Sequence, residues 1–220
     1  MLAGINAEVL TRVAATRSFL RTIENHEVNT TTLGGDAASR TGKGLVFIQN
    51  YATYEYTVNQ SVRALIDALN TRTIPLTQVR TELLALALHA EFESIIKGAL
   101  KKTWESRSDL LRKTRSNLLS KVHDNLFPKD GSHYRAKQLE TIWSIFGIPG
   151  PIVPEEKIRS HIEEMVENRN KIAHGVDSAE SIGRRYTLAE LSTTVDKNEA
   201  LCSHIIAAIS NHVKSPNAFI

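Results

Sequence analysis

The stretch from Gly44 to Asn70 constrains the fold most, because it contains no proline and carries apolar residues on two sides of a helix. Two stripes recur at helical spacing: Leu45, Ile48, Val62 and Ile66 on one, and Phe47, Tyr51, Tyr54, Val58 and Leu65 on the other. A helix that is apolar on two sides usually lies at the centre of a bundle. The rest of the chain therefore has to supply the helices that cover it.

Other segments show the same periodicity and are separated by short breaks. Glycine and proline are scarce, at 11 and 6 of 220 residues, and no alternating strand pattern is present. The sequence predicts an all-α protein, an up-and-down helical bundle with an extra N-terminal helix and additional helices. The predicted helices are 3–23, 44–70, 77–100, 103–120, 134–146, 154–174 and 187–213.

No composition change marks a domain boundary, so a single domain over residues 1–220 is expected. Within it, residues 1–43 would form an N-terminal helix and a polar loop from His26 to Lys43, and residues 44–213 the core bundle. Residues 177–185 are a second expected loop, after a helix that Gly175 would end as its C′ residue.

Composition excludes several classes of protein. Cys202 is the single cysteine, so an intrachain disulfide and a CxxC zinc site are both excluded. The first residues show no signal peptide, and no apolar stretch is long enough to span a bilayer. A cytoplasmic protein that does not bind membranes is expected. The net charge of +3 is small, so a nucleic-acid surface has to come from charge placement.

The segment from Pro154 to Gly175 contains the most unusual residue. Ile158, Ile162, Met165 and Ile172 fall in one helical seam, and the position that completes the series is Arg169. An arginine in an apolar seam is costly unless it is paired. The seam also supplies apolar surface of the kind that dimers bury.

Arg169 and His174 do not share a helix face. Five residues separate them, which on an ideal helix is about 140° of rotation. Asn170 lies four residues before His174 and can contact it. Convergence of Arg169 and His174 therefore requires a distorted helix end or a second copy of the chain.

Glu55 occupies a core-type position on the central helix, among Tyr51, Tyr54 and Tyr56. A carboxylate in such a place needs a cation, and Arg169 is the expected partner. We expect Glu55 to support the site rather than to take part in chemistry directly.

These residue types suit proton transfer and the stabilisation of negative charge without a metal. A histidine with a pKa near ~6.5 exchanges protons at neutral pH, and an arginine stabilises charge on phosphorus with a fixed fork of donors. The catalytic candidates are Arg169, His174 and Asn170, the last holding the imidazole or a phosphate oxygen. The competing interpretation is structural, with His174 as a helix cap and Arg169 as a partner of Glu55.

The segment from Lys97 to Lys121 is strongly basic, with eight basic residues against Glu105 and Asp109. Lys101, Lys102, Arg112 and Lys113 are the candidate RNA-binding residues, although a basic run can also be a solvated face. Trp104 either stacks on a base or, as we expect, packs in the core. The remaining histidines show no metal-ligand grouping, so neither a metal nor another cofactor is expected.

The phrase Arg169-Asn-Lys-Ile-Ala-His174-Gly at the end of a late helix resembles the shared motif of HEPN domains, an arginine followed four to six residues later by histidine. The run from Tyr51 to Asn59 is similar to the first bundle helix of bacterial members. The resemblance covers roughly residues 44–213. It implies a metal-independent endoribonuclease that acts as a homodimer, in bacteria often as a toxin or an anti-phage defence effector. Partners would be RNA and an antitoxin or a defence-complex protein.

Two alternatives stay open from the sequence. One is a catalytically inactive HEPN module that binds RNA, a nucleotide or a partner protein, and the other is a helical adaptor. One subfamily of toxins carries a tyrosine two residues after the histidine, where this chain has Val176. That departure argues against control by nucleotide transfer to a tyrosine.

Overall fold

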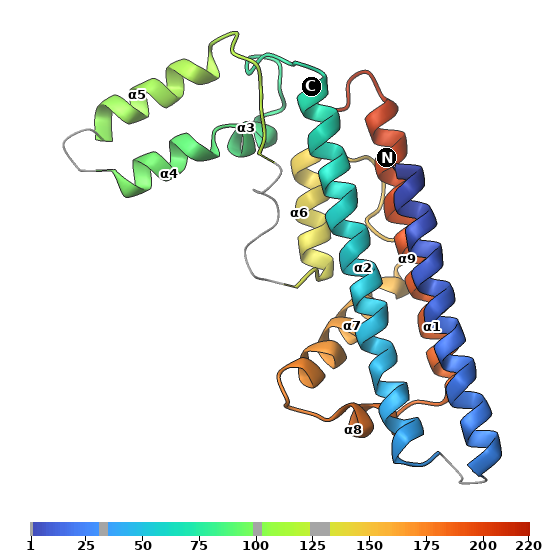
Figure 1. The fold of residues 1–220 in the computed structure, drawn as a ribbon. Coiled ribbons are helices and arrows are strands. Elements are labelled where there is room, and N and C mark those ends of the chain that lie inside the picture. The colour runs from blue at the N-terminus through green and yellow to red at the C-terminus, as the bar shows by residue number, and fades with distance from the viewer. Residues whose placement is uncertain (1, 31–34, 99–102, 124–132) are drawn as a thin grey trace. The chain divides into compact units, whose positions relative to one another are not determined.

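The computed structural model describes residues 2–30, 35–98, 103–123 and 133–220, which form nine helices and no strand. The prediction of an all-α fold is confirmed (Figure 1). The chain divides into two compact units, one of residues 1–61, 133–140 and 150–208, and one of residues 62–132, 141–149 and 209–220. That the two units act as a single domain remains a prediction.

In the first unit, helix α1 (Leu2–Thr30) is amphipathic as predicted, but it extends beyond Ile23. It buries one face, made of Ile5, Val9, Val13, Thr16, Leu20 and Ile23. Arg17 reaches α9 (Leu188–Lys214) and pairs with Asp196 and Glu199 at 2.7 and 2.6 Å. The N-terminal helix is thus an integral part of this unit.

Helix α2 (Ala37–Thr71) begins seven residues earlier than predicted. Asp36 caps it, because its Oδ1 accepts a hydrogen bond of 2.8 Å from the backbone N–H of Ser39. This bond, together with one from His26, lowers the pKa of Asp36 to about 2. The predicted loop from His26 to Lys43 is therefore wrong at both ends, and Lys43 is buried in an ion pair with Glu27 at 3.0 Å.

A short helix, α8 (Ala179–Gly183), lies where a loop was expected, and Ser178 caps it by accepting a hydrogen bond from Ser181. It packs backbone to backbone against α2. A Cβ atom added at Gly44 would lie 2.0 Å from the carbonyl oxygen of Ala179, and one at Gly183 would lie 1.9 Å from that of Arg40. Only glycines permit this approach.

Helix α7 (Lys157–Ala173) carries the arginine motif. Its seam residues Ile158, Ile162 and Met165 are buried, whereas Ile172 is half-buried. They therefore belong to the chain's own core, and the expectation that they offer surface to a dimer is wrong. The start of α6 (Ala136–Phe146) is joined to α7, since Glu163 accepts hydrogen bonds from Arg135 and from the backbone N–H of Ala136.

The second unit contains α3 (Thr81–Ala87), α4 (His89–Lys97) and α5 (Thr103–Thr114). The predicted helix 77–100 is interrupted at Leu88, which is buried and has φ −105° and ψ 17°. Helix α5 ends at Thr114 rather than Ser120, because hydroxyl groups of Thr114 and Ser116 bond to preceding carbonyl oxygens. The residues after it pair locally with residues near Pro75 as an isolated antiparallel bridge.

The chain's last residues complete this unit. Arg72 donates hydrogen bonds to the carbonyl oxygens of Val213 and Pro216 and lies over the ring of Phe219. Phe219 is fully buried. Among the described helices, none combines the length and the apolar character needed to cross a membrane.

Candidate functional site

Arg169 is half-buried near the end of α7, and its guanidinium lies over the ring of Tyr51, 4.9 Å from the ring centroid. Such a cation–π contact contributes about 0.5–2 kcal/mol. The Nη1 atom also donates a hydrogen bond of 3.1 Å to Oδ1 of Asn170. The arginine is therefore oriented by an aromatic face and an amide, and part of its donor fork is left for another group.

His174 lies just outside the regular helix, as the C-cap residue with φ −96° and ψ 4°. Gly175 follows in the left-handed region at φ +68°. The N–H groups of Gly175 and Val176 bond back to the carbonyl oxygens of Ile172 and Lys171, the pattern of a Schellman motif. The regular winding of the helix thus ends at His174, and this residue is exposed.

The expected ion pair between Arg169 and Glu55 is not among those formed by the described residues. Tyr51 contacts both of them instead: its ring carries the guanidinium, and its hydroxyl donates a hydrogen bond of 3.4 Å to Oε1 of Glu55. Burial and the nearby Glu55 carboxylate raise the pKa of Tyr51 to about 12, so the phenol keeps its proton. Glu55 supports the site through this phenol.

Asn170 was a candidate either to hold the imidazole of His174 or to contact a phosphate oxygen. In the described residues its side-chain oxygen accepts from Arg169, while its backbone oxygen accepts from the N–H of His174 at 2.9 Å. Asn170 therefore orients the arginine and closes the last turn of the helix.

The sequence interpretation missed His133, which lies directly before α6. Its Nδ1 atom is 3.3 Å from the hydroxyl of Tyr51, and the two rings meet edge to face. Burial lowers the pKa of His133, and the charges of Arg169, His174 and Arg135 lower it further, against the opposing effect of Glu55. Both motif residues are therefore near enough to His133 for their charges to lower its pKa. That Arg169 and His174 converge on one substrate remains a prediction.

The residues around His133 and α7 are held by side-chain bonds. The hydroxyl of Tyr134 donates to Oδ1 of Asn59 at 2.6 Å, and Arg135 donates to Glu163 at 2.5 Å. On the other side of α7, the buried Asn168 donates to the hydroxyl of Tyr186, whose ring lies 4.8 Å from that of Phe47. Sequence reasoning singled out neither Asn168 nor Tyr186.

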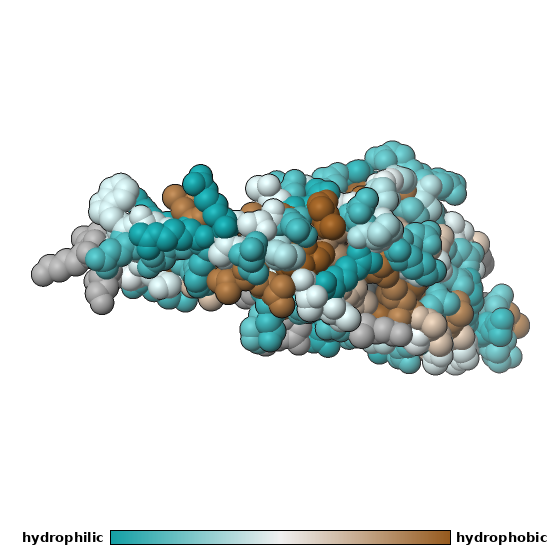
Figure 2. Space-filling view, turned by 90° about the horizontal axis from the view of Figure 1, so that it is seen from above, coloured by the Kyte–Doolittle hydropathy of each residue, from teal (hydrophilic) through white to brown (hydrophobic). Residues whose placement is uncertain are grey.

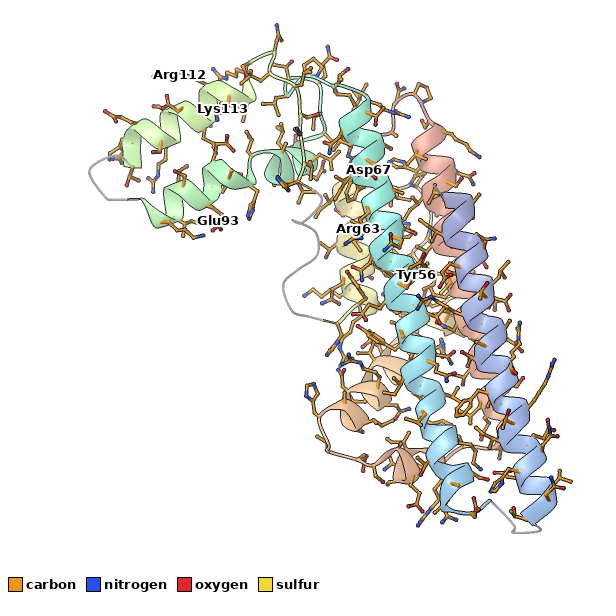
Figure 3. All side chains as sticks on the ribbon, in the orientation of Figure 1. Tyr56, Arg63, Asp67, Glu93, Arg112 and Lys113 are labelled. Carbon is orange, nitrogen blue, oxygen red and sulfur yellow. The ribbon has the colours of Figure 1, made fainter. Side chains whose placement is uncertain are left out.

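Of the basic segment, the structure describes Lys97, at the end of α4, and residues 103–121, which include α5. Helices α4 and α5 contact each other, and neither has a buried residue. Figure 3 labels Arg112 and Lys113 on α5. Arg112 pairs with Asp109 at 2.7 Å on the exposed surface, and Lys113 pairs with Glu91 of α4 at 2.5 Å. Lys101 and Lys102 lie outside the described residues.

Trp104 is 77% exposed, so the expectation that it packs in the core is wrong. The guanidinium of Arg107 lies 5.0 Å from its ring centroid. The view in Figure 2 shows a mostly hydrophilic face interrupted by hydrophobic groups. An exposed indole stacked by an arginine is a feature of surfaces that bind single-stranded nucleic acid.

Among the described residues, no three His, Cys, Asp or Glu side chains lie together as they would to hold a metal ion. Cys202 is buried, and burial raises the pKa of its thiol to about 12, which keeps it protonated and unreactive.

The fold and the site together define an all-α protein in which one helix carries an arginine stacked on an aromatic residue of the central helix and ends at an exposed histidine. The family model described as HEPN_MAE_28990:/-like HEPN matches residues 7–217, and the chain belongs to this HEPN family. Comparison with curated proteins and with solved structures gives no match.

Proposed function

We propose that the protein is a metal-independent endoribonuclease of the HEPN type. The observation that carries the proposal is the placement of both motif residues at one end of α7, with Arg169 half-buried over Tyr51 and His174 exposed as the C-cap residue. HEPN family membership supports a nuclease-like or toxin-like module. In this proposal the 2′-hydroxyl of RNA attacks the adjacent phosphorus, and the chain supplies proton transfer and charge stabilisation.

Each residue of the motif has a role. His174 exchanges a proton with the substrate, for which an exposed imidazole is suited. Arg169 stabilises the charge that develops on the phosphoryl oxygens, because its planar fork binds two oxygens at once. Asn170 keeps the guanidinium in place through the hydrogen bond to Nη1.

The biological setting belongs to the same proposal. The resemblance implies a cytoplasmic toxin or anti-phage effector, active as a homodimer and restrained by an antitoxin or a defence-complex partner. RNA would also contact the basic helix α5, where Lys101, Lys102, Arg112 and Lys113 are the proposed phosphate contacts.

One observation favours a second function, a HEPN module that binds RNA without cleaving it. Trp104 and Arg107 form an exposed stacking platform in the second unit, and this platform requires none of the motif residues. Binding that survives loss of Arg169 and His174, with no cleavage by the intact protein, would favour this function.

The test is incubation of purified protein with single-stranded RNA in excess EDTA, followed by analysis of the fragment ends. We expect cleavage that leaves a 2′,3′-cyclic phosphate and a 5′-hydroxyl. DNA and 2′-O-methyl RNA of the same sequence are matched controls and should stay intact, since neither carries the nucleophile. Loss of cleavage on adding EDTA, or cleavage of the DNA control, would overturn the proposal.

A further inference from the structure

Cleavage through the 2′-hydroxyl requires two proton transfers. One proton leaves the 2′-oxygen as its bond to phosphorus forms, and one reaches the 5′-oxygen as its bond to phosphorus breaks. A single imidazole that serves both has to change protonation state within one step, so ribonucleases of this kind gain from an acid and a base in separate places.

We propose that His133 is the general base of the site, with its Nε2 atom accepting the proton of the 2′-hydroxyl, while His174 donates a proton to the 5′-oxygen. The inference rests on the proposed RNA cleavage and adds a residue outside the HEPN motif.

Hydrogen bonds around Tyr51 determine which ring nitrogen of His133 carries the proton. The hydroxyl of Tyr51 has one proton, which it donates to Oε1 of Glu55 at 3.4 Å. The same oxygen lies 3.3 Å from Nδ1 of His133, so it accepts from Nδ1–H. A neutral imidazole with its proton on Nδ1 has a free lone pair on Nε2. No described residue bonds to Nε2, which leaves it for a substrate.

The charges that face His133 favour the neutral ring. From α7 these are Arg169 and His174, from its own segment Arg135, and from α2 Glu55 and the phenol of Tyr51. Burial and the three cationic groups lower the pKa of His133, and Glu55 opposes them. A neutral imidazole at neutral pH is the form that a base needs.

The residues that follow His133 hold it in place. Tyr134 is buried and bonded to Asn59, and Arg135 is bonded to Glu163 and lies 3.6 Å from Glu167. These bonds tie the residues that follow His133 to both α2 and α7. The imidazole is therefore placed relative to the helix that carries Arg169 and His174.

The bond between the 2′-oxygen and phosphorus forms, and the proton of that oxygen moves to Nε2 of His133. The bond between phosphorus and the 5′-oxygen breaks, and the leaving oxygen takes a proton from His174. Arg169 offsets the charge on the other phosphoryl oxygens, and the products are the 2′,3′-cyclic phosphate and a 5′-hydroxyl.

The experiment compares pH profiles of kcat/KM on a ribodinucleotide and on uridine 3′-(4-nitrophenyl phosphate), whose leaving group departs without a proton. The proteins are wild type, His133→Ala, His174→Ala and Tyr51→Phe, with His26→Ala as the matched control. Circular dichroism and urea unfolding check that each variant folds. Tyr51→Phe keeps the ring under Arg169 and removes only the hydroxyl.

We expect His133→Ala to lose on the order of a hundredfold on both substrates, together with the limb of the profile that rises with pH. His174→Ala should lose as much on the dinucleotide and recover on the activated substrate. Tyr51→Phe should lose about tenfold and move the rising limb to lower pH, since a protonated His133 then lacks one acceptor. His26→Ala should match wild type.

Some outcomes overturn the inference alone and others overturn both proposals. An active wild-type protein with undiminished activity in His133→Ala removes the role of His133 and leaves the proposed function standing. Recovery of His133→Ala on the activated substrate also overturns it, because the histidine would then be the acid. A wild-type protein that cleaves neither substrate overturns the proposed function and the inference together.

Discussion

The guanidinium of Arg169 lies over the ring of Tyr51, and the hydroxyl of that ring bonds to Glu55. The carboxylate and the cation, which the sequence suggested would pair directly, are thus joined through a phenol. Among the residues that the structure describes, Arg169 forms no ion pair with a carboxylate. An arginine that is stacked but not neutralised can bind a phosphate group.

Arg169→Lys should therefore inactivate the protein as fully as Arg169→Ala. Lysine keeps the charge but loses the planar fork and the stacking geometry, so we expect a loss of kcat on the order of a hundredfold or more. Unfolding in urea should change by only about 1 kcal/mol. Arg159→Lys on the same helix is the control and should retain activity. Substantial activity in Arg169→Lys would show that charge alone suffices.

Charge reversal on the basic segment should weaken RNA binding. For the variant with Lys101, Lys102, Arg112 and Lys113 changed to Glu, we expect a lower affinity and a shallower salt dependence, since each lost phosphate contact reduces counterion release. Lys157→Glu, an exposed reversal in the other unit, is the control. Fluorescence anisotropy at several salt concentrations measures both effects.

Lys113 also pairs with Glu91, so its reversal disturbs the contact between α4 and α5. The double change Glu91→Lys with Lys113→Glu restores an ion pair there at unchanged net charge. If this swap alone weakens RNA binding as much as the charge reversal of all four residues, the effect comes from the position of the charge at Lys113. Unchanged affinity in every variant would make α5 a solvated face.

We expect a homodimer by light scattering at micromolar concentration, as the family resemblance implies. The proposed site draws Arg169, His174 and His133 from a single protomer, so each protomer should carry a complete set. Mixing Arg169→Ala protein with His174→Ala protein should then restore no activity. Recovery in the mixture would show that the two residues act across the dimer, and a monomeric mass would contradict the assembly itself.

The contact between α2 and α8 should not tolerate a methyl group. For Gly44→Ala and Gly183→Ala the new Cβ meets a backbone oxygen at 2.0 or 1.9 Å, and neither helix can yield without unpacking. We expect each to lower the free energy of unfolding by about 2 kcal/mol or more. Gly4→Ala, where the Cβ meets open space, should be neutral or stabilise by up to about 1 kcal/mol. Equal stability of the three variants would contradict the packing.

His161 should make the fold sensitive to acid. Burial lowers the pKa of this histidine to about 4 from 6.5, so the unfolded chain binds a proton more readily than the folded one. The neutral His161 ring therefore does not reduce the free energy of unfolding above pH 6.5. As the pH falls toward 4, protonation of the unfolded chain lowers this free energy by roughly 3 kcal/mol. His161→Phe should flatten the dependence of the free energy of unfolding on pH in that interval. An unchanged slope would contradict the burial of a neutral ring.

Periodicity predicted the long helices because their buried faces are continuous, as in α1 and α7. It failed where local side-chain bonds decide the structure. Asp36 starts α2 within a stretch that looked like a polar loop, and its position before Ala37 and Ala38 was a usable cap signal. Leu88 breaks an apparently regular helix, and Trp104 lies exposed although its type favours the core.

The candidate site likewise has one part that follows from helix periodicity and another that only tertiary contacts decide. The positions of Arg169 on α7 and of His174 at its end were predictable because both follow from the periodicity and end of one helix. His133 was not, since it lies in a connection before α6 and reaches Tyr51 only through tertiary packing. The pairing of Glu55 with Arg169 was wrong in its contact because sequence spacing cannot show that a phenol lies against both groups.

The turn at Gly175 also determines where His174 lies relative to the rest of α7. Arg169 is placed by the regular winding of the helix, whereas His174 is placed by the point at which winding stops. One more helical residue would rotate every following side chain by about 100° and shift it by about 1.5 Å along the axis, which would change the placement of His174 relative to Arg169. The length of α7 therefore determines the spacing of Arg169 and His174. A change that shifts the last turn would alter the spacing of the two groups even if both side chains were untouched.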